Sequence, residues 1–204
     1  MKDRTKIIGA TYSDDISGLK LDTSKPYTLE EIYFYEAKNI TKATIKYFSK
    51  VPDKKIAPFS FEWFLELHKE MFGDVWDWAG KLRQVELSIG FKAYQVSIEL
   101  KKLIDDLAFW EKNKSFSTIE IASRLHHRAV QIHPFKNGNG RWSRMLANIY
   151  LKQNGLNPTK WNEDFLSKEN KHRDDYIQAL KDADSGDYSK LIEMQGNIIS
   201  YSHL

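Results

Sequence analysis

The chain has 204 residues, with 31 Lys or Arg against 28 Asp or Glu, so its formal net charge is only +3 at neutral pH. This length fits one domain, or one domain with an extension. A hydrophobic fraction of 41% supplies a core and excludes an intrinsically disordered or collagen-like protein. The absence of cysteine excludes a disulfide framework, thiolate catalysis and Cys-ligated zinc.

No segment has the character of a membrane span or a secretory signal. No apolar run approaches the ~18 residues that a bilayer-spanning helix needs. Residues 1–15 contain no apolar stretch of secretory length. Lysines and acidic residues alternate along the whole chain without a basic block. We therefore expect a cytoplasmic protein that binds neither a membrane nor nucleic acid.

Residues 1–26 are polar and rich in turn-forming residues, and we interpret them as an N-terminal extension to a domain of residues 27–204. A helix is predicted over about residues 27–48, where apolar residues recur at three- and four-residue spacing behind the N-cap candidate Thr28. Ser60 caps a second predicted helix.

The next segment has the period of a β-strand, because apolar side chains alternate with polar ones on both sides of a turn at Gly90. The alternating apolar residues are Val85, Leu87 and Ile89 before the turn, and Tyr94, Val96 and Ile98 after it. We predict one short β-hairpin here.

The remaining pattern is helical. A helix is predicted from after Ser97 to about residue 113, and another from Ser117, where Glu120 completes a capping box. Further helices are predicted over about residues 139–153, 170–183 and 188–200. The predicted fold is all-α with one small β-hairpin.

The residues that indicate chemistry are 133–141, His-Pro-Phe-Lys-Asn-Gly-Asn-Gly-Arg, together with Arg144. The two glycines around Asn139, directly before a helix, allow positive φ values and let successive N–H groups point into one anion-binding concavity. The positive end of the helix adds to this site. Arg141 and Arg144 lie on one helix face, so both can reach the same anion. This pattern predicts a polyphosphate cradle.

Two further side chains of this segment suit phosphate chemistry. His133, at the mouth of the loop, can take a proton at neutral pH, and the side-chain oxygen of Asn137 can ligate a phosphate-bound Mg²⁺. The same residues would also make an ordinary interhelical turn. Arg141 favours the anion site, because a cation in the first helical turn opposes the helix dipole.

Residues 133–141 with Arg144 resemble the signature of the Fic/Doc family, which reads His-x-Phe-x-Asp/Glu-Gly-Asn-Gly-Arg-x-x-Arg. Other segments resemble further parts of that family's pattern. These are residues 78–83 (Trp-Ala-Gly-x-x-Arg), 88–96 (the flap hairpin), 185–192 (the late Gly-Asp-Tyr-x-x-Leu helix) and 36–40. The combined pattern is closest to the branch of the family called mobile mystery protein B.

The resemblance implies a Fic fold, in which a helical core carries a β-hairpin flap. It also implies transfer of AMP from ATP, with Mg²⁺, to a Ser, Thr or Tyr hydroxyl of a target protein. On this basis His133 is the base that deprotonates the target hydroxyl, and Phe135 anchors the loop in the core. The flap residues that would align the target segment by strand pairing are Ile89, Gly90, Phe91 and Tyr94.

The resemblance also implies which residues bind ATP. The loop and helix residues assigned to the nucleotide are Lys136, Gly138, Asn139, Gly140, Arg141 and Arg144. Gly138, Asn139 and Gly140 would hold the α- and β-phosphates, Arg141 the β-phosphate and Arg144 the γ-phosphate. Gly140 replaces the lysine of the Doc-type branch, which favours AMP transfer over phosphorylation.

One position departs from the family pattern. Asn137 stands where the family has the Asp or Glu that holds the metal, and a neutral amide should bind Mg²⁺ more weakly. Two alternatives to AMP transfer therefore stay open. The protein is then a catalytically weak nucleotide-binding module with a regulatory or toxin-like role, or it transfers another phosphate-containing group on the same scaffold.

Regulation is expected to involve a glutamate. Many family members have a Ser/Thr-x-x-x-Glu-Gly/Asn helix whose glutamate pairs with the second arginine. Ser189 and Glu193 fit this spacing, but Met194 breaks the final position, so we interpret that helix as structural. Glu36 in the first helix is the other inhibitory candidate, and an inhibitor or antitoxin protein is a further expected partner.

Other clusters are interpreted as structural. His126, His127 and His133 could suggest a zinc site, but no carboxylates stand at ligand spacing. The six tryptophans are interpreted as core residues rather than a base-stacking platform. Trp142 lies within the signature and is expected to pack against the nucleotide or to hold the helix end.

Overall fold

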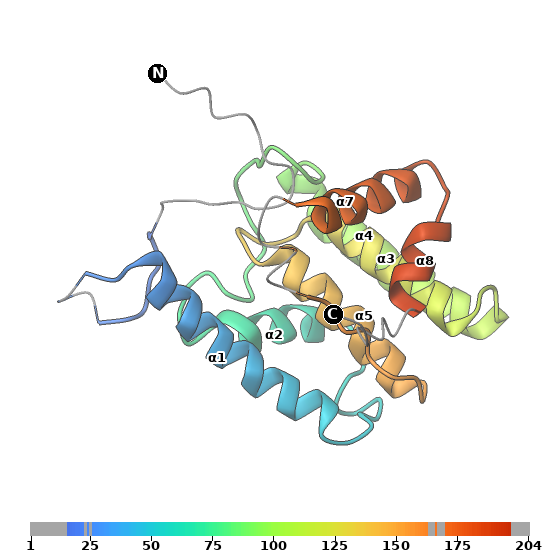
Figure 1. The fold of residues 1–204 in the computed structure, drawn as a ribbon, viewed down its shortest axis with the longest axis horizontal. Coiled ribbons are helices and arrows are strands. Elements are labelled where there is room, and N and C mark those ends of the chain that lie inside the picture. Colours follow the sequence, from blue (N-terminus) through green and yellow to red (C-terminus); the bar gives the residue numbers. More distant parts are fainter. Residues whose placement is uncertain (1–15, 23, 25, 163–165, 167–169, 197–204) are drawn as a thin grey trace.

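The computed structural model describes residues 16–22, 24, 26–162, 166 and 170–196 (Figure 1). Within them the chain is helical and contains no β-strand. The helices are α1 Leu29–Phe48, α2 Phe61–Phe72, the short 3-10 helix η1 Ala93–Gln95, α3 Val96–Asn113, α4 Thr118–Ile132, α5 Asn139–Gln153, α7 Lys171–Asp184 and α8 Ser189–Gly196. The all-α prediction is confirmed. The end of the helix predicted to reach residue 200 lies outside the described residues.

The predicted N-caps position three of these helices. Thr28 caps α1 in a capping box with Glu31, and the side chains of Ser60 and Ser117 accept backbone N–H groups of α2 and α4. The capping box predicted at the start of α4 is not formed. Glu120 turns its carboxylate to Arg124, one helical turn further on, instead of back to Ser117.

Helices α4 and α5 form the centre of the fold. They pack against each other, α1 and α2 pack together and against α5, and α3 and α8 pack against α4 (Figure 1). Large side chains that are fully buried fill the contacts, among them Phe64, Leu125, Phe135, Trp142 and Leu146. The loop between α4 and α5 therefore starts and ends on the central helix pair of the fold.

The β-hairpin prediction is wrong. Residues 84–92, here called the flap segment, are irregular, and the expected second arm begins the helices η1 and α3. Side chains bind the backbone groups that a strand ladder would use. Arg83 donates to the carbonyls of Val85 and Phe91, and the carboxylate of Glu86 accepts the N–H of Ala93. The segment with alternating apolar residues is therefore held by hydrogen bonds from the Arg83 side chain to its backbone, and not by strand pairing.

Part of the expected N-terminal extension lies against the domain. Leu19 and Trp76 form an isolated antiparallel bridge, and the carbonyl of Gly18 accepts the N–H of Asp77 at 2.8 Å. Residues 17–20 therefore run beside the turn that follows α2. The boundary at residue 26 stays a prediction.

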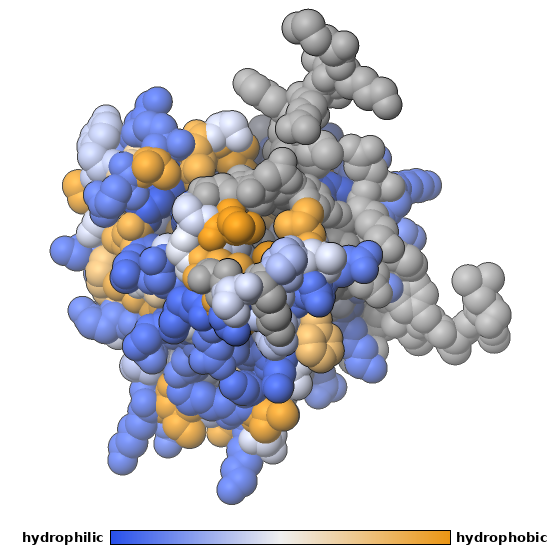
Figure 2. All heavy atoms as spheres, turned by 90° about the vertical axis from the view of Figure 1, so that its left-hand side faces the viewer, coloured by the Kyte–Doolittle hydropathy of each residue, from blue (hydrophilic) through white to orange (hydrophobic). Residues whose placement is uncertain are grey.

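The face of the molecule on the α1 side is mainly polar. Figure 2 shows the α1 side of the molecule, where apolar side chains are scattered among hydrophilic ones. Among the described residues, no helix combines the length and apolarity that a membrane crossing requires.

Candidate active site

The segment singled out in the sequence forms the connection between α4 and α5. His133 ends α4 with a left-handed backbone (φ 54°), and Gly138 (φ 79°) is the N-cap of α5. Helix α5 begins at Asn139, as predicted, so its first N–H groups point out of the helix at this loop. Of the two glycines expected to supply positive φ values, only Gly138 does so. We call residues 133–138 the motif loop.

The motif loop is held from inside by Asn139 and Phe135. The Asn139 side chain accepts the Phe135 N–H at 2.9 Å and donates to the Phe135 carbonyl at 2.8 Å. The Phe135 ring is fully buried, 3.6 Å from the ring of His68 and 5.0 Å from that of Trp142. Phe135 thus anchors the loop as expected. Because the Asn139 side chain is committed to Phe135, Asn139 can meet a phosphate only through its backbone N–H.

His133 has the geometry of a proton acceptor. It is 6% exposed, and its Nδ1 lies 3.3 Å from the Val130 carbonyl. A carbonyl only accepts, so Nδ1 carries the proton and Nε2 is the ring's acceptor. Burial lowers the pKa of His133 to about 4; the hydrogen bond to Val130 opposes this shift and the charge of Arg83 adds to it. The imidazole is therefore neutral at pH 7.

Arg83 and Gly90 place the flap segment over His133. Arg83 is buried and donates from Nε to the His133 carbonyl at 2.7 Å, while its Nη atoms bind the flap carbonyls of Val85 and Phe91. Gly90 has φ +94°, and a Cβ on it would lie 2.5 Å from the His133 Cβ. Only glycine allows the flap segment to approach the histidine this closely.

A buried carboxylate occupies the arginine side of the site. Glu36 on α1 is 1% exposed, and its Oε2 lies 2.5 Å from Nη1 of Arg141. Its other oxygen accepts the Nε1–H of Trp76 at 2.6 Å. The Arg141 guanidinium also lies over the ring of Phe72, 4.7 Å from its centroid. The inhibitory candidate thus contacts the first arginine of the motif.

The Fic/DOC family model matches residues 58–151, which include all of these motif residues. The structure is similar to Fic-1 from C. elegans, with a TM-score of 0.65 and 24% identity over 82% of this chain and 48% of that one. It is also similar to BepC from Bartonella tribocorum with bound AMPPNP, with a TM-score of 0.59 and 17% identity over 84% of this chain and 88% of that one. Residues 58–151 of the chain match the Fic/DOC family and have the fold of its solved structures.

Curated relatives of this Fic/DOC domain are named protein adenylyltransferase Fic. The Aedes aegypti protein is 27% identical over 155 residues, which are 74% of this chain and 30% of that protein. The Drosophila grimshawi protein is 32% identical over 127 residues, 60% of this chain and 25% of that protein. The chain thus spans about a third or less of the length of these relatives. The assignment to the mobile mystery protein B branch stays a prediction.

The second arginine of the Fic/DOC motif, Arg144, is buried beside Tyr176 of α7, whose ring centroid lies 5.8 Å from the guanidinium. A Cβ on Gly140 would lie 3.3 Å from Nη1 of Arg144, so the missing side chain leaves room for this arginine. Arg141 and Arg144 are both on the first turns of α5, as the spacing predicted.

Two loop residues have other partners in this state. Nζ of Lys136 donates to Ser17 Oγ at 2.9 Å, so it points to the N-terminal segment. Oδ1 of Asn137 accepts the N–H of Gly138 at 2.6 Å. Either group must turn to meet a nucleotide or its metal, so their assigned roles stay predictions.

The residues judged structural have structural contacts. Nε1 of Trp142 donates to the Phe64 carbonyl at 3.2 Å, so Trp142 packs in the core and not against a nucleotide. His126 and His127 bind Tyr176 and Tyr188 of the α7–α8 region. Helix α8 packs through the fully buried Leu191 against α7.

The flap residues differ in exposure. Tyr94 lies in η1 with 78% of its surface exposed, while Ile89 and Phe91 are partly buried. The backbone of Phe91 is bound by Arg83, so this carbonyl is not available to a partner strand.

Sequence reasoning missed the role of Arg83, because its partners lie up to 50 residues away. It also missed His68 and Trp76. The Trp-Ala-Gly-x-x-Arg segment was the signal that could have found Arg83.

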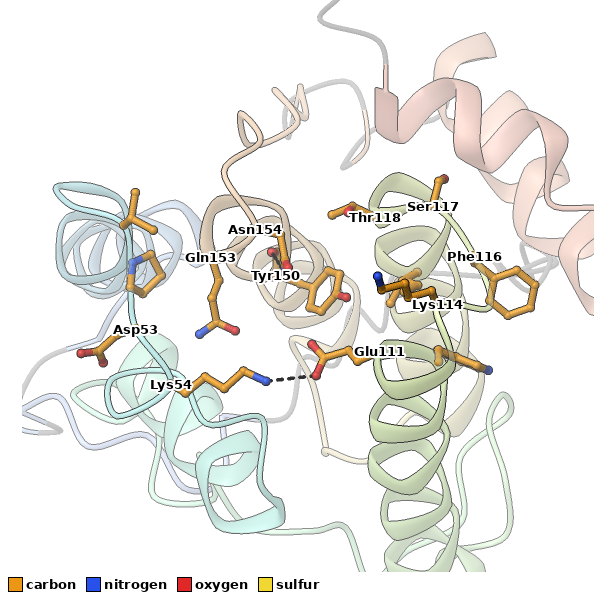
Figure 3. A pocket seen from close by; sticks show the side chains of 14 residues that line it. Asp53, Lys54, Glu111, Lys114, Phe116, Ser117, Thr118, Tyr150, Gln153 and Asn154 are labelled. Carbon is orange, nitrogen blue, oxygen red and sulfur yellow. Dashed lines mark hydrogen bonds and ion pairs between the residues drawn. The ribbon is translucent and has the colours of Figure 1, made fainter.

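The cavity in Figure 3 is separate from this site. It has a volume of about 790 Å³ and lies among residues 51–54, the C-terminal ends of α3 and α5, and the start of α4. The ion pair of Lys54 and Glu111 (3.1 Å) crosses it, and Tyr150 points into it (Figure 3). Tyr150 is 11 residues along α5 from Asn139, roughly 16 Å at 1.5 Å per residue.

Proposed function

We propose that this protein transfers AMP from ATP to a Ser, Thr or Tyr hydroxyl of a target protein. The observation that carries the proposal is the neutral, Nε2-accepting His133 at the start of a helix that presents Arg141 and Arg144. A base beside a polyphosphate cradle is what transfer of a phosphate-containing group requires. The adenylyltransferase names of the curated relatives support AMP as the group transferred.

In the proposed reaction His133 acts first on the target. Its Nε2 takes the proton of the target hydroxyl as the hydroxyl oxygen forms a bond to the α-phosphorus. The bond between the α-phosphorus and the bridging oxygen of the β-phosphate breaks, and pyrophosphate leaves with that electron pair. The proton stays on His133 until solvent removes it, so charge and atoms balance.

The start of α5 holds the leaving group. Backbone N–H groups of Gly138, Asn139 and Gly140 and the helix dipole stabilise the negative charge on the phosphates. Arg141 and Arg144 add two guanidinium groups, the second within the room left by Gly140. Lys136 joins them when it leaves Ser17. These phosphate-binding roles are part of the proposal.

Mg²⁺ fits the site only as an ion carried by the nucleotide. When bound, it neutralises phosphate charge during transfer. The described residues hold no group of three or more His, Cys, Asp or Glu suited to a metal. Oδ1 of Asn137 is one oxygen ligand that the loop could offer. Mg²⁺ is commonly bound by only one or two protein oxygens, with phosphate and water oxygens completing its coordination.

The target protein is proposed to dock at the flap segment beside His133. Ile89, Gly90, Phe91 and the exposed Tyr94 are the residues assigned to this contact. We further propose that Glu36 inhibits the enzyme. Its carboxylate and a nucleotide phosphate compete for the same guanidinium of Arg141, so the ion pair must open before ATP binds productively.

A second candidate function is a nucleotide-binding module with weak catalysis. The observation that favours it is Asn137, whose neutral amide replaces an acidic metal ligand and is hydrogen bonded to Gly138. An inhibitor or antitoxin protein would then be the partner whose binding depends on whether a nucleotide is bound.

Isotope labelling separates these proposals. The wild-type protein is incubated with Mg²⁺ and ATP labelled at the α-phosphate or, in parallel, at the γ-phosphate. Protein-bound α-label that His133→Ala abolishes supports AMP transfer. Label from the γ-phosphate alone means phosphorylation. Retained ATP without any protein label supports the binding module or an inhibited enzyme that awaits its target.

A further inference from the structure

His68 lies at the centre of the site without belonging to the motif. It is on α2, has no exposed surface, and contacts two loops that are far apart in sequence. Its Nδ1 lies 3.0 Å from the backbone N of Gly80, in the Trp-Ala-Gly turn. Its Nε2 lies 3.0 Å from the carbonyl oxygen of Asn137, in the motif loop.

These two partners fix the tautomer of His68. A backbone N–H only donates and a carbonyl only accepts, so Nδ1 is the acceptor and Nε2 carries the proton. The ring therefore has one donor and one acceptor, and both are used.

The bond to Asn137 sets the direction of the next N–H group. In a trans peptide the carbonyl and the following N–H point in opposite directions. The Asn137 carbonyl is turned inward to His68, so the N–H of Gly138, the N-cap of α5, points away from that ring. Oδ1 of Asn137 covers this outward N–H at 2.6 Å, as an anion oxygen would.

Packing restricts the inner side of this peptide. The His68 ring stacks on Phe135 at 3.6 Å with an interplanar angle of 14°. A Cβ on Gly138 would lie 2.7 Å from the Phe72 ring and 3.3 Å from Nε2 of His68. Gly138 thus lies closely against Phe72 and His68, and the His68 ring is itself held by Phe135.

We infer that His68 is a positioning residue of the phosphate site: its Nε2–H holds the Asn137–Gly138 peptide so that the Gly138 N–H donates to a phosphate oxygen of the nucleotide. The inference rests on the proposed function for its ligand. Its geometric part, the orientation of the Gly138 N–H by His68, stands without any nucleotide.

The test compares His68→Phe, which keeps the stacked ring but removes both hydrogen bonds, with His68→Gln, which restores an amide donor toward Asn137. His127→Phe is the matched control. His127 is also a buried histidine with two engaged ring nitrogens, but its partners, Tyr188 and Asp184, belong to the α7–α8 region.

The first readout uses the protein without nucleotide. We expect ¹⁵N NMR to show His68 as an Nε2–H tautomer, and Gly138 amide exchange to accelerate about tenfold in His68→Phe but not in His127→Phe. A ring protonated on Nδ1, or unchanged Gly138 exchange in folded His68→Phe, would overturn the inference whether or not the protein binds ATP.

The second readout is the affinity for the β,γ-imido analogue of ATP, measured by calorimetry. We expect His68→Phe to bind about tenfold more weakly, His68→Gln to recover part of the loss, and His127→Phe to match the wild type. Equal affinity of folded His68→Phe and wild type would refute the inference. A wild type and a Glu36→Gly variant that both fail to bind the analogue would refute the proposed function, while the first readout still decides the role of His68.

Discussion

Glu36 and Arg141 are 105 residues apart in sequence and form a 2.5 Å ion pair at the start of α5. The pair joins α1 to the helix that carries the phosphate-binding residues, and Trp76 fixes the second carboxylate oxygen. A buried carboxylate at this place neutralises a cation that the proposed reaction needs. In the proposed reaction a nucleotide phosphate must therefore displace Glu36 from Arg141.

Glu36→Gln should raise the affinity for ATP. The amide keeps an oxygen for Trp76 or Arg141 but removes the competing charge. Because a charge-assisted hydrogen bond contributes about 1.5–3 kcal/mol, the gain should be on the order of tenfold or more. Calorimetric titration measures it. Glu99→Gln is the control, since Glu99 is a buried carboxylate paired with Arg128 at 3.0 Å outside the motif. Equal gains in both variants would contradict the account.

Gly90→Ala should reduce target modification while leaving ATP binding unchanged. The added Cβ would stand 2.5 Å from that of His133 and push the flap segment off the base. A rate loss of at least about tenfold is expected at saturating ATP. Gly186→Ala is a matched control, because Gly186 has the same φ of +94° with nothing within 4 Å of an added Cβ. If both variants lose activity equally, backbone strain and not the approach to His133 is the cause.

Acid should destabilise the fold through His133. Its pKa is lowered from 6.5 to about 4 by burial, so between these values the unfolded chain binds a proton that the folded chain does not. The contribution to stability is therefore full above pH 6.5 and is lost as the pH falls toward 4. It amounts to about 3 kcal/mol. Urea unfolding of wild type and His133→Gln at several pH values measures it, and the variant should lose that part of the pH dependence. An NMR titration midpoint of His133 near 6.5 would contradict the assignment.

Asn137→Asp should lower the Mg²⁺ concentration needed for activity. Aspartate has nearly the same shape and keeps an oxygen acceptor for the Gly138 N–H, so the loop should stay intact. A carboxylate binds Mg²⁺ better than an amide, and we expect half-saturation at about tenfold less metal. Activity titrated with Mg²⁺ after chelation tests this. Identical titration curves would show that Asn137 does not face the metal.

The helices could be predicted because their information is local. Apolar spacing and the caps Thr28, Ser60 and Ser117 lie within each helix, and the structure places α1, α2 and α4 behind them. The motif loop was also predictable, because Gly138 and the arginines of α5 stand together in sequence.

The failures come from contacts between distant residues. Alternating apolar residues suggested a hairpin, but Arg83 binds the carbonyls of Val85 and Phe91 and replaces the strand ladder. No sequence motif singles out His68. Its link to Asn137 spans 69 residues, and no local spacing encodes it.

The most direct test of the central claim is the intact mass of Glu36→Gly after incubation with ATP and Mg²⁺, compared with Glu36→Gly/His133→Ala. Both proteins carry the released Arg141, so they differ only in the proposed base. The account predicts an AMP adduct on the single variant and none on the double variant. An adduct on both, or none on a single variant that binds ATP, would contradict AMP transfer by His133.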